Sequence, residues 1–299
     1  MASQQQAIIK SLQETQASSI VNEIFPTHPF TLANSLPHHP LFEPERIKRL
    51  LRAMPREFVE IRAVESRGTE DGNYIRGKLL KEADPVETFE RLEERPAWML
   101  LHQTWAHDRD YNQLLQEYIA ELSEMFGEMR PGVNRIGCWM FLSSGNSVVH
   151  FHADPDQSFL NQIRGSKTVY VYPTRVLAEE IVEDLVFTED QGKVVYRPDY
   201  AEAMFEPVRL TPGDSVFLPL YAPHRVTNDG DLCISWNVGF HTRHSSRRRA
   251  AHYVNHELRR WGLKPQSFGE QAGTDTFKSY FEWPLRAKKK LARLIGIKG

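Results

Sequence analysis

The segment VVHFHADPD at residues 148–156 is the most informative part of this sequence. Side chains alternate between the two faces of an extended strand, so His150, His152 and Asp154 are expected to point the same way. Such a polar strand face is unusual, because the face turned to a core normally carries apolar residues. A His-x-Asp pair supplies two of the three ligands of a facial triad that binds non-haem Fe(II). The segment therefore predicts part of a metal site on a β-sheet.

The third ligand is expected from a later segment, LTPGDSVFLPLYAPHRV at residues 210–226. Its Pro-Gly-Asp marks a turn, Ser215–Leu218 is a short apolar strand, and the loop after that strand carries His224. Because His224 lies far along the chain from His152, only the fold can bring the two imidazoles together.

A lysine at the start of another predicted strand indicates a ligand with negative charge. In the strand KTVYVY at residues 167–172, alternation puts Lys167 on the same face as Val169 and Val171. A buried ammonium group is costly unless an anion meets it. A co-substrate with two carboxylates would supply that anion.

The last predicted strand, residues 232–240, has one large apolar face and one small polar face. The polar face carries Cys233, Ser235, Asn237 and Gly239. A small, polar lining suits a ligand cavity better than a packed core. We therefore expect this strand to form one wall of the site.

The sequence between Gly132 and His241 consists of short apolar or alternating runs, separated by turns rich in Gly, Pro, Asn and Asp. This pattern predicts an antiparallel β-sandwich or barrel. We expect a mostly helical region over residues 1–130 that packs on a β core over residues 131–243. Helices are expected again over residues 244–299. The predicted fold class is mainly β with flanking helices.

Composition excludes several classes of protein. The chain has 37 Lys and Arg against 39 Asp and Glu, a formal net charge of −2. It therefore lacks the excess of basic residues that is typical of a nucleic-acid-binding protein. Two cysteines are too few for a disulfide scaffold. No apolar run approaches the roughly 18 residues that a membrane-spanning helix needs. We expect no secretory signal and a cytoplasmic protein.

The C-terminal segment from Trp283 onward is basic. It contains Arg286, Lys288–Lys290, Arg293 and Lys298, and it contains no acidic residue. A solvated helix is the simpler interpretation. The alternatives are a peripheral helix on the inner face of a membrane, a helix that docks on an acidic partner, and a homodimer contact.

Residues 139–242 resemble the JmjC/cupin-like family of Fe(II)- and 2-oxoglutarate-dependent oxygenases. The motifs that carry the resemblance are HADPDQSFLNQIRGSK at 152–167, PGDSVFLPLYAPHR at 212–225, and the strand that contains Asn237. Members of this family have a Lys fifteen residues after the first metal-binding His, and Lys167 stands at that position. The resemblance implies a double-stranded β-helix, or jelly-roll, core.

The family resemblance also implies the chemistry. The implied metal ligands and catalytic residues are His152, Asp154 and His224. Lys167 would pair with the distal carboxylate of 2-oxoglutarate, with Asn237 and Ser158 close by. The expected reaction uses O₂, hydroxylates a C–H bond, and releases succinate and CO₂. Bacterial Kdo hydroxylases and hydroxylases of protein residues are similar groups, so we expect either a lipid-linked sugar such as Kdo or a peptide side chain as substrate.

Two positions depart from the family pattern. Val149 stands where the family often has a Thr that contacts 2-oxoglutarate, and Ser158 stands where related enzymes often have Asn. Arg225 and Arg243 are alternative partners for a carboxylate, because the guanidinium group binds carboxylates through two parallel hydrogen bonds.

Two other functions stay open on the sequence. A ligand set of His150, His152 and His224 would indicate a cupin metalloenzyme that does not use 2-oxoglutarate. Lys167 argues against that set, because such a site offers no anion to the ammonium group. A non-catalytic, cupin-like binding or regulatory protein is the second alternative, because a fold does not determine a function.

Overall fold

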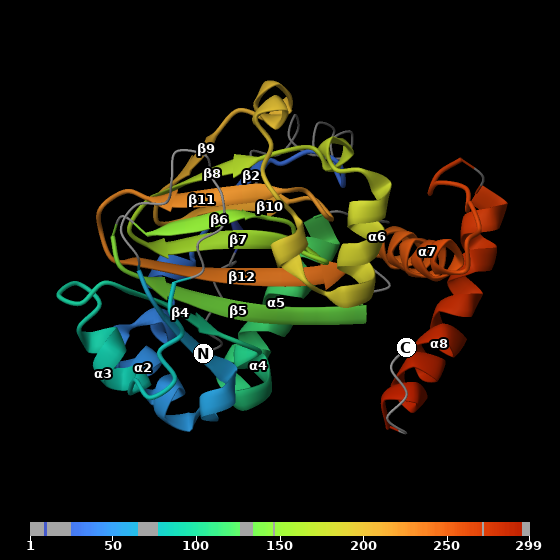
Figure 1. Ribbon diagram of the computed structural model, residues 1–299. Helices are drawn as coiled ribbons and strands as arrows, with labels where there is room; N and C mark the ends of the chain where they lie inside the picture. The colour runs from blue at the N-terminus through green and yellow to red at the C-terminus, as the bar shows by residue number, and fades with distance from the viewer. Residues whose placement is uncertain are drawn as a thin grey trace.

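The computed structural model describes residues 9–10, 25–64, 77–125, 134–145, 147–270 and 272–294. Its strands form two sheets (Figure 1). The larger sheet has the strand order β1-β2-β10-β7-β12-β5-β4-β3, and the smaller sheet has the order β6-β11-β8-β9. Every neighbouring pair is antiparallel.

The strands are β1 Ile9–Lys10, β2 Thr31–Asn34, β3 Val59–Ala63, β4 Ala97–Leu101, β5 Asn134–Ser143, β6 Val148–His152, β7 Gln157–Arg164, β8 Lys167–Val171, β9 Val208–Leu210, β10 Asp214–Leu218, β11 His224–Asn228 and β12 Cys233–His241. The α-helices are α2 Pro44–Ala53, α3 Pro85–Glu90, α4 Thr104–His107, α5 Arg109–Met125, α6 Glu179–Thr188, α7 Arg243–Arg260 and α8 Ala272–Leu294.

The two sheets pack face to face, and apolar side chains from both fill part of the space between them. Val169 and Val226 of the smaller sheet belong to the same buried cluster as Leu160, Val216 and Leu218 of the larger sheet. Along β8 the burial alternates as the sequence pattern predicts. The predicted fold class, a jelly-roll core with flanking helices, is confirmed.

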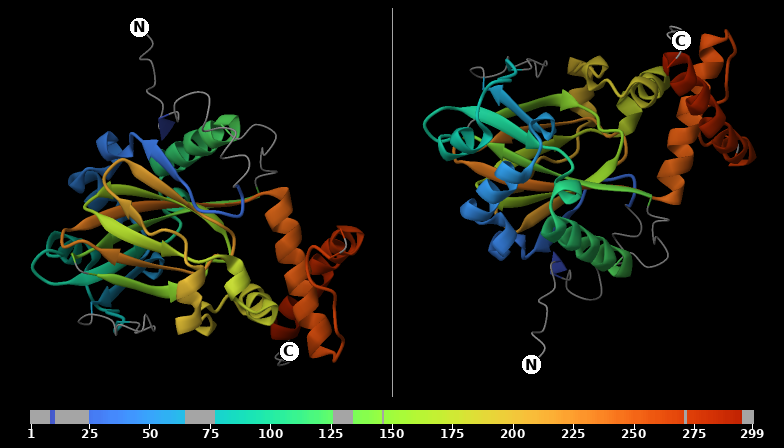
Figure 2. Two further views of the ribbon diagram at one scale, coloured as in Figure 1. Left: turned by 90° about the horizontal axis from the view of Figure 1, so that it is seen from above. Right: turned by 90° about the horizontal axis from the view of Figure 1, so that it is seen from below.

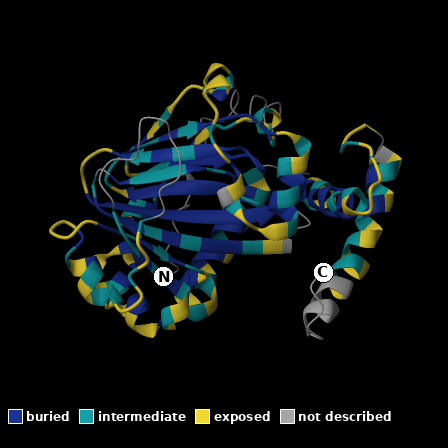
Figure 3. Ribbon diagram, in the orientation of Figure 1, coloured by how far each residue is buried: buried dark blue, intermediate teal, exposed yellow. Residues whose placement is uncertain are grey.

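Helices pack on the outer face of the larger sheet, and α6 packs beside one end of the smaller sheet (Figure 2). Outside the larger sheet, Trp236 of β12 packs in one cluster with Leu50 of α2 and Tyr118 of α5. Outside the smaller sheet, Phe151 of β6 shares a cluster with Leu185 of α6. β7 and β12 of the larger sheet are almost wholly buried, the strands of the smaller sheet carry both buried and half-buried residues, and the outer helix surfaces carry most of the exposed ones (Figure 3).

Strands from the N-terminal region extend the larger sheet at both edges. β2 pairs with β10 at one edge, and β4 and β3 continue the sheet beyond β5 at the other. The prediction of a mostly helical region over residues 1–130 did not include these strands. They have only four or five residues each, and such short runs cannot be told from helix segments by periodicity alone.

The C-terminal helices α7 and α8 stand side by side at one end of the sandwich, next to α6 (Figures 1 and 2). A capping box begins α7: the Thr242 hydroxyl accepts from the Ser245 backbone N–H at 3.1 Å, and the Thr242 N–H donates to Ser245 Oγ at 2.7 Å. Among the described residues, no helix has the length and apolar character required to cross a membrane.

Candidate metal centre

Two strands of the smaller sheet bring three metal-ligand side chains together. His152 ends β6, Asp154 follows it by two residues, and His224 begins β11 directly opposite His152 in the antiparallel register. The Nε2 atom of His152 lies 3.8 Å from Oδ1 of Asp154, and Nε2 of His224 lies 3.8 Å from Oδ2. The two imidazole centroids are 4.2 Å apart. One ion can contact all three side chains, since one ligand atom from each lies within 4.8 Å of the others.

Backbone carbonyls orient both imidazoles for metal binding. Nδ1 of His152 lies 2.6 Å from the carbonyl oxygen of His150, and Nδ1 of His224 lies 3.0 Å from that of Ala222. A carbonyl oxygen can only accept, so each Nδ1 carries the hydrogen and each Nε2 presents a lone pair toward Asp154. Burial, and then the neighbouring His152, lower the pKa of His224 to about 4. His224 is therefore neutral at physiological pH, as a metal ligand must be.

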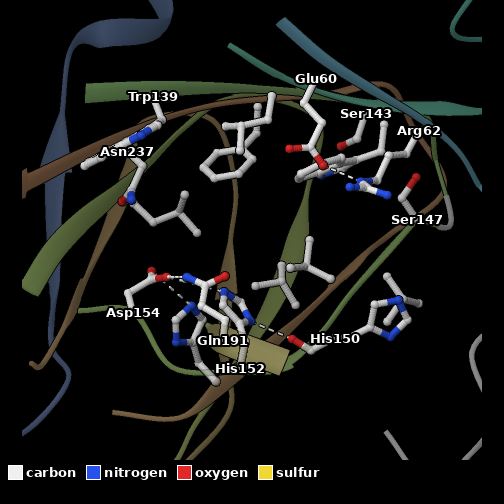
Figure 4. Close-up of a pocket in the computed structure, with 18 of the residues that line it drawn as sticks. Glu60, Arg62, Trp139, Ser143, Ser147, His150, His152, Asp154, Gln191 and Asn237 are labelled. Atoms are coloured by element: carbon white, nitrogen blue, oxygen red, sulfur yellow. Dashed lines mark hydrogen bonds and ion pairs between the residues drawn. The ribbon is translucent and has the colours of Figure 1, made fainter. Parts of the chain in front are cut away.

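The carboxylate of Asp154 has a further partner. The side-chain amide of Gln191 donates to Asp154 Oδ1 at 2.7 Å (Figure 4). Gln191 comes from the turn after α6, and nothing in the sequence near it resembles a ligand motif. Sequence reasoning missed this contact because the turn reaches the metal centre only through the tertiary fold.

A cavity of about 530 Å³ lies beside the three ligands and between the two sheets (Figure 4). Its lining includes every candidate site residue that the sequence predicts: His152, Asp154, Ser158, Lys167, His224 and Asn237. His150 also lines the cavity but is not part of the three-ligand group. Arg225 and Arg243 do not line it, and Arg225 instead stacks on the Tyr170 ring at 4.0 Å.

Lys167 brings a buried ammonium group to this cavity. Its side chain is on the inward face of β8 with Val169 and is only 4% exposed. Burial lowers its pKa to about 8, although the nearby Cys233 partly opposes this shift. Within the described parts of the chain, no carboxylate lies close enough to form an ion pair with Lys167. The ammonium group is thus available to an anion in the cavity.

Two other polar atoms of the cavity wall are buried as well. Ser158 Oγ and Asn237 Oδ1 have no hydrogen bond within the described residues, although both side chains are buried. Buried polar groups are normally hydrogen-bonded, so orphaned atoms on a cavity wall fit a bound ligand or water. Both residues belong to the larger sheet, where Ser158 is opposite Gly239 and Asn237 is opposite Leu160.

The far wall of the cavity comes from the N-terminal strands and was not predicted. Across the sheet, Phe141 of β5 is opposite Leu100 of β4, which is opposite Glu60 of β3. Glu60 is ion-paired with Arg62, and its other oxygen lies 3.6 Å from His102. The cavity therefore changes from apolar side chains near β5 to charged side chains near β3 (Figure 4). No sequence motif links these residues to residues 148–156.

A second group with ligand-like spacing lies between α6 and α7. It consists of Glu179, Glu183 and His252. Cationic side chains already contact it: Arg259 Nε donates to Glu183 Oε2 at 2.7 Å, and Arg248 Nε donates to His252 Nε2 at 3.4 Å. It acts as an ion-pair network between the two helices.

Comparison with known proteins supports the fold. The chain matches the family described as "Cupin-like domain" over residues 56–246. It is 30% identical to lysine-specific demethylase 8 of Danio rerio over 112 residues, which are 35% of this chain and only 26% of that relative.

Similar solved structures come from Escherichia coli. The X-ray structure of YcfD has a TM-score of 0.50 and 16% identity, over 92% of this chain and 68% of that chain. A structure of YcfD, named there as a ribosomal oxygenase, in complex with cobalt and 2-oxoglutarate has a TM-score of 0.46 and 14% identity. That match covers 90% of this chain and 66% of the other.

Proposed function

This chain belongs to the cupin-like domain family, and we propose that within it the protein is an Fe(II)- and 2-oxoglutarate-dependent oxygenase that hydroxylates a C–H bond. Family membership confirms the expected cupin-like resemblance. The observation that carries the proposal is the presence, in one cavity, of a two-His, one-carboxylate group and a buried ammonium.

The donor set fits a facial triad. His152, Asp154 and His224 offer two neutral imidazole nitrogens and a carboxylate, the ligand types of non-haem Fe(II) oxygenases. Such a triad leaves further metal positions for a co-substrate and O₂. The chemistry that bound Fe(II) supplies is oxidative decarboxylation of 2-oxoglutarate by O₂, which yields succinate and CO₂ and adds one oxygen atom to the substrate.

The protein binds and orients the co-substrate. Lys167 pairs with the distal carboxylate of 2-oxoglutarate, and this ion pair would stabilise the buried ammonium group of Lys167. The orphaned Ser158 Oγ and Asn237 Oδ1 lie on the wall of the same cavity and are available to the ligand or its water. The apolar side chains of the cavity, among them Leu160, Leu218 and Val226, exclude bulk water from the reacting groups.

The substrate occupies the rest of the cavity, toward β4 and β3. We propose a sugar of a glycan or lipid, such as Kdo, or a peptide or protein side chain. An aromatic and aliphatic wall that ends at Glu60, Arg62 and His102 can hold either class. Succinate release measured across lipid, peptide and soluble cell fractions, followed by a mass search for a gain of one oxygen atom, would identify it.

Anaerobic titration of the protein with Fe(II) and 2-oxoglutarate tests the proposal. We expect the weak visible metal-to-ligand charge-transfer band of the ternary complex, and its loss in Asp154→Ala. A metal-loaded protein that catalyses oxidation but releases no succinate would support the 2-oxoglutarate-independent cupin enzyme instead. A protein that binds neither metal nor 2-oxoglutarate would support the non-catalytic alternative.

We further propose that α8 contacts an anionic membrane at its inner, cytoplasmic face. Four aromatic side chains on α8 are exposed: Phe277, Tyr280, Phe281 and Trp283. The acids of this helix face away from that surface, because Asp275 is buried and Glu282 is paired with Arg249 and Arg286. Aromatic and basic residues together suit an anionic interface. The side chains of Lys288–Lys290 and Arg293, and all of Lys298, lie outside the described residues.

Sedimentation with vesicles tests this contact. Vesicles that contain phosphatidylserine should pull down the protein, and zwitterionic vesicles should not. The double change Tyr280→Ser, Trp283→Ser should reduce the bound fraction. The alternative outcome is that the protein binds neither kind of vesicle, elutes as a dimer, and becomes a monomer after the same double change. That result would show that a second copy of the chain covers α8 instead.

A further inference from the structure

We propose that Gln191 is a positioning residue for Asp154, an inference that rests on the proposed metal site. Its amide hydrogen bond fixes the carboxylate so that Oδ2 is the oxygen offered to the metal. Each oxygen lies 3.8 Å from one imidazole, Oδ1 from Nε2 of His152 and Oδ2 from Nε2 of His224. Only Oδ1 also accepts a hydrogen bond, from Gln191 Nε2 at 2.7 Å, and Oδ2 has no hydrogen-bond donor among the described residues. The two oxygens of one carboxylate are therefore not equivalent.

This difference matters for the number of metal positions that stay open. A carboxylate can bind a metal through one oxygen or through both. If Asp154 bound through both, it would take a position that 2-oxoglutarate or O₂ needs. A hydrogen bond that holds Oδ1 opposes the rotation that would bring both oxygens onto the metal. Outer hydrogen bonds of this kind commonly orient metal ligands.

The chemistry of Gln191 suits this role. An ionised carboxylate only accepts hydrogen bonds, so the amide must present its NH₂ group to Asp154. A neutral donor orients the carboxylate without neutralising it, in contrast to a Lys or Arg. Glu at this position would place a second negative charge 2.7 Å from the first, if the contact were kept.

The backbone around Gln191 is held independently of its side chain. The Glu189 N–H donates to the Leu185 carbonyl at 2.8 Å and closes α6, and the Val194 N–H donates to the Gln191 carbonyl at 3.1 Å. Val194 is buried, and Lys193 is ion-paired with Asp184 of α6 at 2.6 Å. The backbone of this turn therefore holds the Gln191 side chain in a fixed position next to Asp154. A change of the Gln191 side chain should leave the fold intact.

Titration with Co(II), followed by absorption and without turnover, tests this inference. We expect Gln191→Leu to bind Co(II) roughly 10–100-fold more weakly, the range seen when outer-shell partners are removed. Its Co(II) absorption spectrum should shift, because the carboxylate changes its binding mode, and 2-oxoglutarate should bind the Co(II)-saturated variant more weakly. Gln191→Glu should weaken Co(II) binding or shift the spectrum in the same way.

Lys193→Ala is the matched control, since it removes an ion pair from the same turn without touching Asp154. It should bind Co(II) like the unmodified protein and give the same spectrum. If Gln191→Leu matches the unmodified protein in both measurements while Asp154→Ala loses Co(II), the positioning role is wrong and the metal site stands. If Asp154→Ala itself binds Co(II) normally, the proposed function fails as well.

Discussion

Two clusters among the described residues have metal-ligand spacing, and the comparison shows that proximity alone does not make a metal site. His152, Asp154 and His224 form one, and Glu179, Glu183 and His252 form the other; in each, the ligand atoms lie within 4.8 Å of one another. The difference lies in the partners that these side chains already have.

In the first cluster the hydrogen bonds leave the ligand atoms open. Carbonyl oxygens engage Nδ1 of both imidazoles, so their Nε2 lone pairs face the carboxylate. No Lys or Arg among the described residues is ion-paired with Asp154. A cation is what this arrangement lacks.

In the second cluster cationic side chains of the protein already contact the imidazole and a carboxylate, although Glu183 Oε1 and His252 Nδ1 have no hydrogen-bond partner among the described residues. Arg248 donates to Nε2 of His252, so the hydrogen of that neutral ring is on Nδ1, the atom that faces Glu179 at 3.8 Å. Arg259 supplies the positive charge to Glu183. Burial, followed by Arg248 and Lys278, lowers the pKa of His252 to about 3. Protein side chains therefore already supply the positive charge that a metal ion would bring to this cluster.

The largest expected effect comes from removing a ligand in each cluster. Asp154→Ala should abolish Fe(II) binding and succinate release, because two imidazoles alone do not complete the triad. Glu183→Gln should leave both unchanged. Metal content of the two purified variants and a succinate assay measure this. Loss of bound metal in Glu183→Gln would mean that the second cluster also binds metal and that the comparison is wrong.

The next effect is on stability and concerns only the second cluster. Arg259→Leu leaves the buried carboxylate of Glu183 without its cation, and breaking a buried pair by removing one partner costs about 3 kcal/mol. Urea unfolding measures this loss. Arg260→Leu is the control, since its ion pair with Glu257 is 43% exposed on the Arg side and should contribute less than about 1 kcal/mol.

The stability loss in Arg259→Leu should depend on pH. Burial raises the pKa of Glu183, so the folded protein binds this proton more readily than the unfolded chain. Stability therefore falls as pH rises through that raised pKa, and the deficit of the variant shrinks in acid. A deficit that is independent of pH would show that lost packing of Arg259, and not the unpaired carboxylate, is its cause.

The sequence predicts the first cluster far better than its surroundings. His152 and Asp154 are two residues apart, so strand alternation alone puts them together, and the turn before β10 identifies the loop that carries His224. Lys167 follows from the face that it shares with Val169. These inferences need only local geometry and the general form of a β-sandwich.

The rest of the site depends on contacts that no local pattern encodes. Gln191 reaches Asp154 from a turn 37 residues away in sequence. Glu60 and Arg62 line the cavity because β3 and β4 add to the edge of the larger sheet, and those strands are too short to be predicted from periodicity. Likewise, spacing places Glu179 and Glu183 on one face of a helix, but only the fold adds the cations of α7 that close the second cluster.

A smaller effect is expected at Lys167, which unlike Arg259 has no ion-pair partner within the part of the chain that the structure describes. Lys167→Met should weaken 2-oxoglutarate binding by about 1.5–3 kcal/mol, the value of a hydrogen bond to a charged group. The pKa of about 8 adds a pH test. Because only the ammonium form binds the carboxylate, affinity of the unmodified protein should fall above pH 8 and affinity of Lys167→Met should not. Calorimetric titration of the metal-loaded protein measures both, and identical pH profiles would exclude Lys167 as the anion partner.

The same distinction between open and satisfied atoms predicts the smallest effect, at two buried serines. Ser158 Oγ lines the cavity and has no hydrogen-bond partner in the described ranges of the chain, whereas Ser235 Oγ donates to Gln162 Oε1 at 2.7 Å. Ser158→Ala should leave stability unchanged and weaken 2-oxoglutarate binding by about 1 kcal/mol, roughly fivefold. Ser235→Ala should do the reverse, because it leaves Gln162 without its donor and lowers stability by about 1–2 kcal/mol. If instead Ser158→Ala lost stability and kept its affinity, the hydroxyl would have a partner inside the protein, and orphaned atoms on this cavity wall would no longer indicate where the ligand lies.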